Sequence, residues 1–189
     1  MRLLTPSPPP SAPVGGVDRV SGRDPSPGFR VLGIDPGLVE TGFGLLERRA
    51  PAPRVIEAGV ILTPRIDPLE ARLERLHSEV SKLFDRLAPA IVVIEDLYSE
   101  YKFPKAAILM GHARGVICLA ARQAGVTLVP MAPAEVKRAV TTNGAASKGQ
   151  VQRGVQMLLG LSETPRPSHV ADALALALTG LSRVGGRLR

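Results

Sequence analysis

Two acidic side chains each close a short apolar segment of the chain. Asp35 ends the run VLGID, and Glu95 ends the run IVVIE. A carboxylate in such a place is costly to bury unless something compensates its charge, and a divalent cation does so by binding the oxygens of neighbouring carboxylates. Either acid alone could simply mark a solvated strand end, so the hypothesis of a cation site depends on the two lying together.

A third acid and a histidine occur in the segment PSHVADALALAL near the C-terminus. Pro167 and Ser168 predict the start of a helix, with Ser168 as its N-cap. His169 and Asp172 are three residues apart and therefore share a helix face, and the Ala- and Leu-rich remainder predicts a buried helix. Asp172 could merely offset the helix dipole and His169 could be an ordinary surface histidine, but their common face makes both candidate ligands.

The four candidates together are a set of oxygen and nitrogen ligands: Asp35, Glu95, His169 and Asp172. Three carboxylates and one imidazole suit Mg²⁺ or Mn²⁺, and the absence of a Cys/His cluster argues against zinc. Phosphodiester hydrolysis needs a nucleophilic water, charge neutralisation at phosphorus and support for the leaving oxygen, which two ions about 3.5–4 Å apart supply together. The predicted chemistry is therefore phosphodiester hydrolysis with two ions per active site.

Hydrophobic patterning predicts the elements that must position these side chains. Short apolar or alternating runs predict strands at Arg30–Asp35, Thr41–Glu47, Arg54–Leu62, Ala90–Glu95 and Thr127–Met131. Helical spacing and helix boundary signals predict helices at Pro68–Leu87, about Lys105–Gln123, Pro133–Val140, Lys148–Leu159 and Ser168–Leu181. Gly125 is expected to end the second of these helices.

The order β-β-β-α-β-α-β-α predicts a mixed five-stranded sheet with helices on both faces. The first three strands are close together in the sequence and favour an antiparallel meander. This is the strand order of an RNase H-like α/β domain. In that sheet the strands that end in Asp35 and Glu95 are neighbours, so both carboxylates emerge at the carboxyl ends of strands, where α/β sheets bind ligands.

The charge distribution indicates a polyanionic partner. The net charge is +7, and residues 1–101 carry 12 Lys or Arg against 14 Asp or Glu, whereas residues 102–189 carry 12 against 3. A basic half of this kind points first to nucleic acid, although a basic surface kept for solubility would have the same composition.

Four side chains are candidate contacts to DNA. Lys137, Lys148 and Arg114 are basic residues of the predicted helices, where they could hold phosphates and so position a duplex without reading its sequence. Tyr98 follows three residues after Glu95, and an exposed aromatic ring there could stack on an unpaired base. The alternative for Tyr98 is a ring folded back onto the core.

The ends of the chain differ in composition from its centre. Residues 1–29 contain 7 of the 18 prolines and predict a disordered extension, followed by a nuclease domain over residues 30–183 and a basic tail over residues 184–189. Cys118 is the single cysteine, which fits a reducing compartment, so a cytoplasmic location is expected. No apolar run approaches the ~18 residues of a membrane span, so no membrane partner is expected.

Four segments, in this order and spacing, resemble the RuvC family of bacterial Holliday junction resolvases. They are GIDPG followed by TGFG, IEDLY followed by GHARGV, the stretch from Lys137 to KGQVQ, and HVADALALA. The likeness runs from about Arg30 to Leu181, which is most of the chain. It departs from the family in the proline-rich leader and in Ser147, where many members carry an acid before the lysine.

The resemblance assigns roles to the candidate residues. It implies three metal-binding catalytic acids, which are Asp35, Glu95 and Asp172 in this chain. His169 stands at a position where the family has either Asp or His, and so it inherits the role of a ligand. Tyr98 matches an aromatic position implicated in unstacking bases at the crossover, and Lys137 and Lys148 match basic positions that contact junction DNA.

The function implied by the resemblance is the resolution of four-way DNA junctions in recombination and repair. Such an enzyme acts as a homodimer that places two active sites on strands of like polarity and makes paired symmetrical nicks near the crossover. Its family partner is a branch-migration helicase complex.

Three other functions were compatible with parts of the sequence. A nuclease that matures ribosomal RNA also has GIDPG and a late Asp, but KGQVQ and the aromatic residue after Glu95 favour the resolvase. An actin-like ATPase or sugar kinase would need a second phosphate-binding domain, for which 189 residues leave no room. A non-catalytic junction-binding subunit would have little need for all three acids.

Overall fold

The computed structural model describes residues 28–96 and 104–185, and its elements follow the predicted order. The strands are β1 (Arg30–Asp35), β2 (Glu40–Glu47), β3 (Arg54–Leu62), β4 (Ile91–Glu95) and β5 (Thr127–Met131). The helices are α1 (Leu69–Leu87), α2 (Pro104–Gln123), α3 (Pro133–Thr141), α4 (Lys148–Leu159) and α5 (Ser168–Gly185). The predicted stacking residue Tyr98 and most of the predicted N-terminal extension lie outside the described residues.

Element boundaries differ from the predicted ones at both ends of the domain. Gly28 and Phe29 already form backbone hydrogen bonds with Arg48, beyond the end of β2. The prediction that Ser168 is an N-cap is wrong, because Ser168 is the first residue of α5. The helix also continues past Leu181, since Val184 packs against the core. None of the helices in the described ranges has the length and apolar character that a membrane crossing requires.

The five strands form one mixed sheet in the order β3-β2-β1-β4-β5. β1 pairs antiparallel with β2 and parallel with β4, and Ile34 lies opposite Ile94 in the parallel pair. Because these two residues are in register, Asp35 and Glu95 end their strands side by side. The predicted sheet and the predicted neighbourhood of its first and fourth strands are therefore confirmed.

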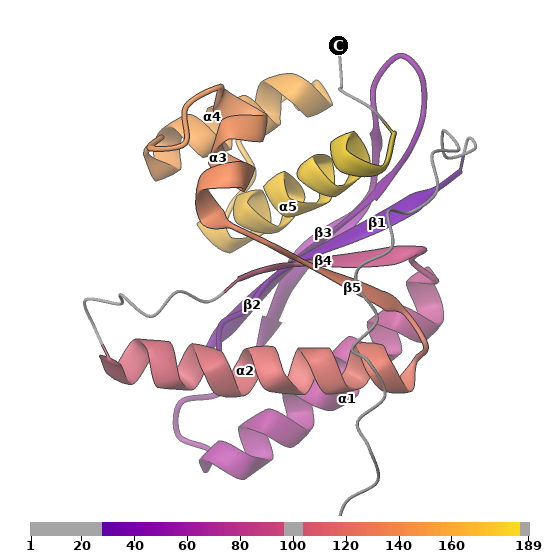
Figure 1. Cartoon of the computed structure of the whole chain (residues 1–189). Helices are drawn as coiled ribbons and strands as arrows, with labels where there is room; N and C mark the ends of the chain where they lie inside the picture. The colour runs from indigo at the N-terminus through magenta and orange to yellow at the C-terminus, as the bar shows by residue number, and fades with distance from the viewer. Residues whose placement is uncertain (1–27, 97–103, 186–189) are drawn as a thin grey trace, which may run out of the picture.

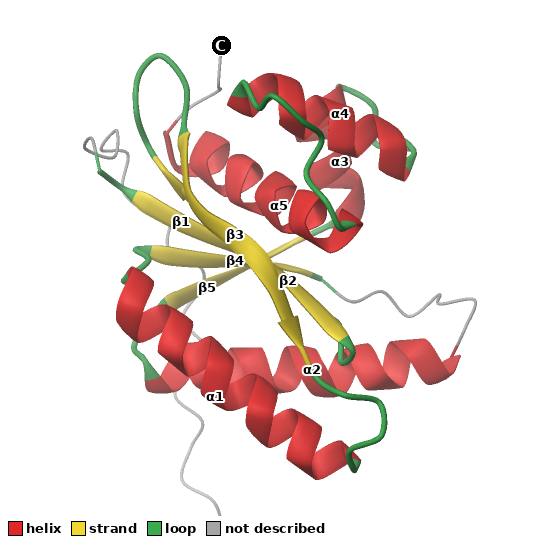
Figure 2. Ribbon diagram, turned by 180° about the vertical axis from the view of Figure 1, so that it is seen from behind, coloured by secondary structure: helices red, strands yellow, loops and turns green. Residues whose placement is uncertain are grey.

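Helices cover both faces of the sheet, with α1 and α2 on one face and α3, α4 and α5 on the other (Figures 1 and 2). Side chains of a strand alternate between faces. Val31 and Val93 accordingly pack in the core on the α5 side, whereas Leu32 and Ile94 pack on the side of α1 and α2. Asp35 and Glu95 continue the first series, so both carboxylates point to the face that carries α5.

The backbone of helix α5 packs directly against β1 because Gly33 has no side chain. A Cβ at this position would overlap the backbone carbonyl oxygen of Ala173 and lie 2.7 Å from the backbone nitrogen of Ala177. The Ala and Leu residues of α5 are buried on this side of the sheet. The small residues on both sides thus set the distance from the strand that carries Asp35 to the helix that carries Asp172.

Replacing Gly33 by alanine is expected to destabilise the protein by about 2–3 kcal/mol, because the extra methyl group pushes α5 away from β1. The free energy of unfolding, measured by urea denaturation, checks this expectation. The matched control is Gly149→Ala in α4, where the added Cβ meets only the Arg153 guanidinium at 3.7 Å and stability should not fall. Equal stability of Gly33→Ala and the control would contradict the close packing described above.

Candidate metal centre

The four predicted ligand residues lie in one open cleft of about 720 Å³ at the end of the sheet. Asp35 comes from the end of β1, Glu95 from the end of β4, and both His169 and Asp172 come from the beginning of α5. Lys137 of α3 and Lys148 of α4 also line this cleft. The structure therefore brings together six of the eight residues that the sequence nominated.

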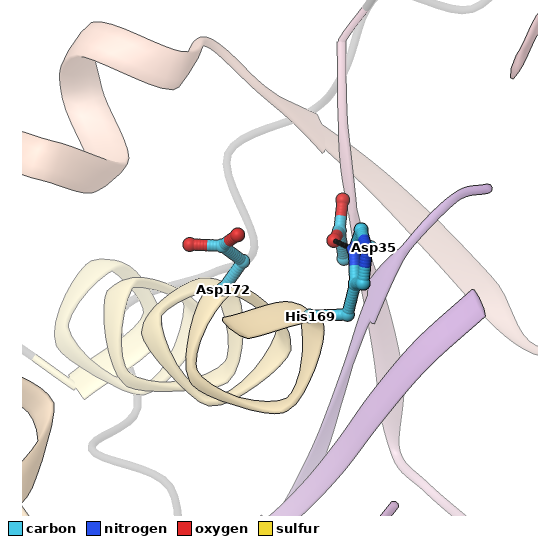
Figure 3. A group of neighbouring side chains, drawn as sticks. All are labelled: Asp35, His169 and Asp172. Carbon is cyan, nitrogen blue, oxygen red and sulfur yellow. Dashed lines mark hydrogen bonds and ion pairs between the residues drawn. The ribbon is translucent and has the colours of Figure 1, made fainter. Parts of the chain in front are cut away.

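Three of these side chains form a compact cluster (Figure 3). Asp35, His169 and Asp172 each offer a ligand atom, and these atoms all lie within 4.8 Å of one another. His169 Nδ1 is 2.7 Å from Asp35 Oδ2, and Asp35 is only 8% exposed. The cluster thus joins residues that are 134 positions apart in the sequence.

Helix α5 can begin at the cluster because β2 has a glycine beneath it. A Cβ on Gly42 would overlap the backbone carbonyl of His169 and lie 3.0 Å from the His169 Cβ. Gly42 is also the antiparallel partner of Asp35. The first turn of α5 therefore rests directly on the strand pair that ends in the buried acid.

Crowding of negative charge is evident in the raised pKa values of two carboxyl groups. Burial, with the added effect of the charges of Asp35 and Asp172, raises the pKa of Glu95 to about 7. The pKa of Asp172 is also raised, first by burial and then by the charge of Asp35. Lys137 and Lys148 oppose both shifts but do not cancel them. The protein alone leaves this group of acids short of positive charge.

The negative charge of the cluster also raises the pKa of the His169 imidazole. Its pKa is raised, mainly by the hydrogen bond with Asp35, and the carboxylates of Asp35, Glu40 and Asp172 add to the effect. A proton on this ring supplies part of the positive charge that the acids attract. The raised pKa therefore favours the protonated ring, which would offset part of the negative charge of the carboxylates.

The donor set suits a hard divalent cation. Carboxylate oxygens and one imidazole nitrogen are ligands for Mg²⁺ or Mn²⁺, and the raised pKa values show that extra positive charge would be favourable here. A cation would displace protons from these groups, so its affinity should rise with pH. The geometry and the electrostatics of the cluster thus both fit a metal centre.

The two lysines of the cleft are placed by well-defined helix structure. Lys148 is the first residue of α4, and a capping box fixes this end: Ser147 Oγ accepts from the Gln150 backbone N–H, and the Gln150 side chain accepts from the Ser147 N–H. A lysine beside exposed N–H groups at a helix N-terminus favours a phosphate. Ser147, the departure from the family pattern, is therefore the N-cap of this helix.

The guanidinium of Arg114, which was predicted to contact a DNA phosphate, forms hydrogen bonds within the protein. Its Nε donates a hydrogen bond to the backbone oxygen of Glu95 at 3.2 Å, and its Nη2 donates to Asp96 Oδ1 at 3.0 Å. The side chain is only 22% exposed. Arg114 thus ties α2 to the end of β4 and holds the backbone that carries Glu95.

Sequence reasoning missed two charged residues of the cleft and the residues that support them. Glu40, at the start of β2, and Arg65, between β3 and α1, both line the cleft. Behind them, the buried Arg72 donates hydrogen bonds to the Leu38 carbonyl and to Thr63. A usable signal existed for Glu40, because an antiparallel β2 begins at the sheet edge where β1 ends. Arg72 carried no such signal.

Comparisons with known proteins agree with this architecture. The family model described as crossover junction endodeoxyribonuclease RuvC matches residues 31–180. The crossover junction endodeoxyribonuclease RuvC of Rhodopirellula baltica is 47% identical over 150 residues, covering 79% of this chain and 84% of that protein. Thermus thermophilus RuvC has a TM-score of 0.73 at 36% identity, covering 82% of this chain and 95% of that one. The T. thermophilus RuvC in complex with Holliday junction substrate also has a TM-score of 0.73, at 34% identity, covering 84% and 96%.

The sheet order and its two helical layers define an RNase H-like fold with a cluster of acids at the strand ends. The chain belongs to the RuvC family of crossover junction endodeoxyribonucleases. This membership disfavours both the ribosomal RNA nuclease and the actin-like ATPase. The predicted family and the predicted fold are confirmed.

Proposed function

We propose that this protein is an endonuclease that resolves Holliday junctions by metal-dependent hydrolysis of phosphodiester bonds. The observation that carries the proposal is the cluster of Asp35, His169 and Asp172, with Glu95 at the neighbouring strand end in the same cleft. Family membership supports the activity, and a relative at 34% identity has been solved with Holliday junction substrate. An intact acid set also argues against a subunit that only binds junctions.

We assign the four ligand residues to two Mg²⁺ or Mn²⁺ ions. When bound, such ions supply a nucleophilic water, neutralise the phosphate and support the leaving oxygen. The roles of the chain are to hold the carboxylates of Asp35, Glu95 and Asp172 close together, and to present a ring nitrogen of His169 beside them. Burial of Asp35 limits access of bulk water to this side of the cluster.

The positive side of the cleft is proposed to hold the DNA backbone. Lys137 and Lys148 lie close enough to the acids to oppose the rise in the pKa values of both Glu95 and Asp172. A phosphate in the cleft would therefore lie between these ammonium groups and the metal ligands. Arg114 and Tyr98 remain proposed DNA-binding residues, and the contacts of the Arg114 guanidinium within the protein are with the end of β4.

Replacing either lysine by alanine is expected to weaken junction binding and to reduce the slope of log K against log salt by about 1, because each lysine neutralises one phosphate. Fluorescence anisotropy with a labelled junction in EDTA, at several salt concentrations, measures both quantities without cleavage. The control is Lys82→Ala in α1, whose ammonium is exposed and pairs with Glu79. An unchanged salt slope in both lysine variants would place the DNA elsewhere.

We further propose a homodimer and a branch-migration helicase complex as protein partners. Helix α2 carries exposed apolar side chains, with Ile108 59% and Leu119 52% exposed. They border an apolar groove whose lining is Leu73, Ile108, Gly111, His112, Gly115, Val116 and Leu119. Exposed apolar patches of this kind often mark protein interfaces, and a two-fold dimer would place two active sites on one junction.

The proposed division of the chain follows from these assignments. Residues 30–183 are proposed as the nuclease domain, preceded by a proline-rich extension over residues 1–29 and followed by a basic tail over residues 184–189. The hydrogen bonds of Gly28 and Phe29 and the packing of Val184 extend the folded domain to these residues. The proposed DNA substrate agrees with the cytoplasmic location expected from the sequence.

The experiment that tests the function is cleavage of a synthetic four-way junction with Mg²⁺ or Mn²⁺, with linear duplex and EDTA as controls. We expect paired symmetrical nicks near the crossover, and no cleavage of the duplex or in EDTA. A protein that bound the junction but never cut it with either ion would be a binding subunit. Preferential cleavage of structured RNA would instead indicate a nuclease of RNA maturation.

A further inference from the structure

Glu40 is an additional acid at the cluster that no predicted role covers. It is the first residue of β2 and lines the same cleft as Asp35 and Asp172. Its Oε2 lies 3.7 Å from His169 Nε2, and its side chain is 42% exposed. The distance is slightly longer than a hydrogen bond, but such contacts in ligand-free active sites are often long and tighten when the site is filled.

The backbone that carries Glu40 is held firmly in place. Thr41 Oγ1 donates to the Gly37 carbonyl at 2.6 Å and so closes the turn between β1 and β2. The Leu38 carbonyl of this turn accepts hydrogen bonds from Thr63 and from Arg72, which is buried. Only the Glu40 side chain therefore needs to adjust to shorten its distance to His169.

The two ring nitrogens of His169 face different acids. Nδ1 lies 2.7 Å from Asp35 Oδ2, within the cluster of three ligand residues, whereas Nε2 faces Glu40. A neutral imidazole binds a metal ion through one nitrogen and carries its proton on the other. In metal sites the protonated nitrogen usually donates to a carboxylate or carbonyl, and this partner fixes the orientation of the ring.

We propose that Glu40 is a positioning residue for His169. Its carboxylate accepts a hydrogen bond from His169 Nε2–H. This leaves the Nδ1 lone pair for a divalent ion that Asp35 and Asp172 would also bind, whereas without an ion Nδ1 is hydrogen-bonded to Asp35. This inference rests on the proposed metal centre, and it adds a residue that acts through the histidine. It also predicts that Glu40 matters only when residue 169 is a histidine.

A cycle of four proteins tests the inference by Mn²⁺ affinity, measured by calorimetry: the wild type, Glu40→Gln, His169→Asp and the double variant. We expect Glu40→Gln to weaken Mn²⁺ binding about tenfold in the wild-type background, the lower end of the effect of losing such a partner. In the His169→Asp background the same change should alter affinity much less, since no ring remains to be oriented. Glu70→Gln, an exposed acid of α1, is the control for the loss of one negative charge.

The tautomer of His169 gives a second readout, from ¹⁵N NMR of the protein with Mg²⁺. The proton is expected on Nε2 in the wild type and on both nitrogens, in a mixture, in Glu40→Gln. Equal losses of Mn²⁺ affinity in the two backgrounds would mean that Glu40 acts only through its charge and not through the ring, which would overturn the inference. A proton on Nδ1 in the wild type would also overturn it. Wild-type protein that bound no Mn²⁺ would overturn the metal centre itself, whereas wild-type binding with an unaffected Glu40→Gln would overturn only the role of Glu40.

Discussion

The change of Asp172 to asparagine is expected to reduce cleavage of a four-way junction roughly 10³-fold while leaving junction binding intact. Asparagine keeps the size of the side chain but removes the charge that binds a divalent ion. Loss of the transition-state stabilisation that a metal site provides, several kcal/mol, corresponds to this reduction at about 1.36 kcal/mol per tenfold in rate. Single-turnover cleavage and anisotropy titration of the same junction measure the two quantities separately.

The matched control for this prediction is Asp85→Asn, the same chemical change at an exposed position of α1. It should cut the junction at the wild-type rate. If the Asp172 variant retained most of the activity, the cluster of Asp172 with Asp35 and His169 would not be the metal site used for cleavage. A parallel loss of junction binding and cleavage would instead indicate a role in DNA contact.

Ionised Glu95 lowers the stability of the metal-free protein, although its charge is expected to bind the ion. In the folded chain its pKa is about 7, compared with an ordinary value of 4.5, so folding favours its protonated form. Stability is then fully present below about pH 4.5 and is lost as the pH rises through about 7. The difference between the two pKa values corresponds to a loss of up to about 3 kcal/mol at alkaline pH in the absence of a metal ion.

Replacing Glu95 by glutamine is therefore expected to stabilise the metal-free protein by up to about 3 kcal/mol at pH 8 and by nothing at pH 4.5. Cleavage should fall roughly 10³-fold, because a carboxylate that binds the ion is lost. Urea denaturation in EDTA at the two pH values measures the gain. Glu74→Gln, at an exposed position of α1, should show no such pH-dependent gain, and equal stability of Glu95→Gln and the wild type at pH 8 would contradict the proposed repulsion.

The main acids of the site could be predicted because local patterns mark them. Asp35 and Glu95 each end an apolar strand, and two adjacent parallel strands place their carboxyl ends at one edge. His169 and Asp172 could be paired because a spacing of three residues puts them on one helix face. The sheet order followed from the succession of strands and helices, and it then brought β1 next to β4.

The supporting contacts could not be predicted, because they join segments that no local pattern relates. Arg72 reaches the Leu38 carbonyl across 34 positions, and Arg114 reaches the Glu95 carbonyl across 19. Arg114 illustrates the difficulty, since its basic side chain suggested only a phosphate contact. Glu40 was also missed, because the strand predicted from Thr41 began one residue too late to include it.

The central claim is that Asp35, Glu95, His169 and Asp172 bind the divalent ions used for cleavage. Anomalous diffraction at the manganese edge, from crystals of the protein soaked in Mn²⁺, tests it most directly. We predict anomalous peaks within bonding distance of the carboxylates of Asp35 and Asp172 and of a ring nitrogen of His169, and their absence in Asp172→Asn. Manganese peaks at other positions, with none in this cleft for the wild type, would contradict the account.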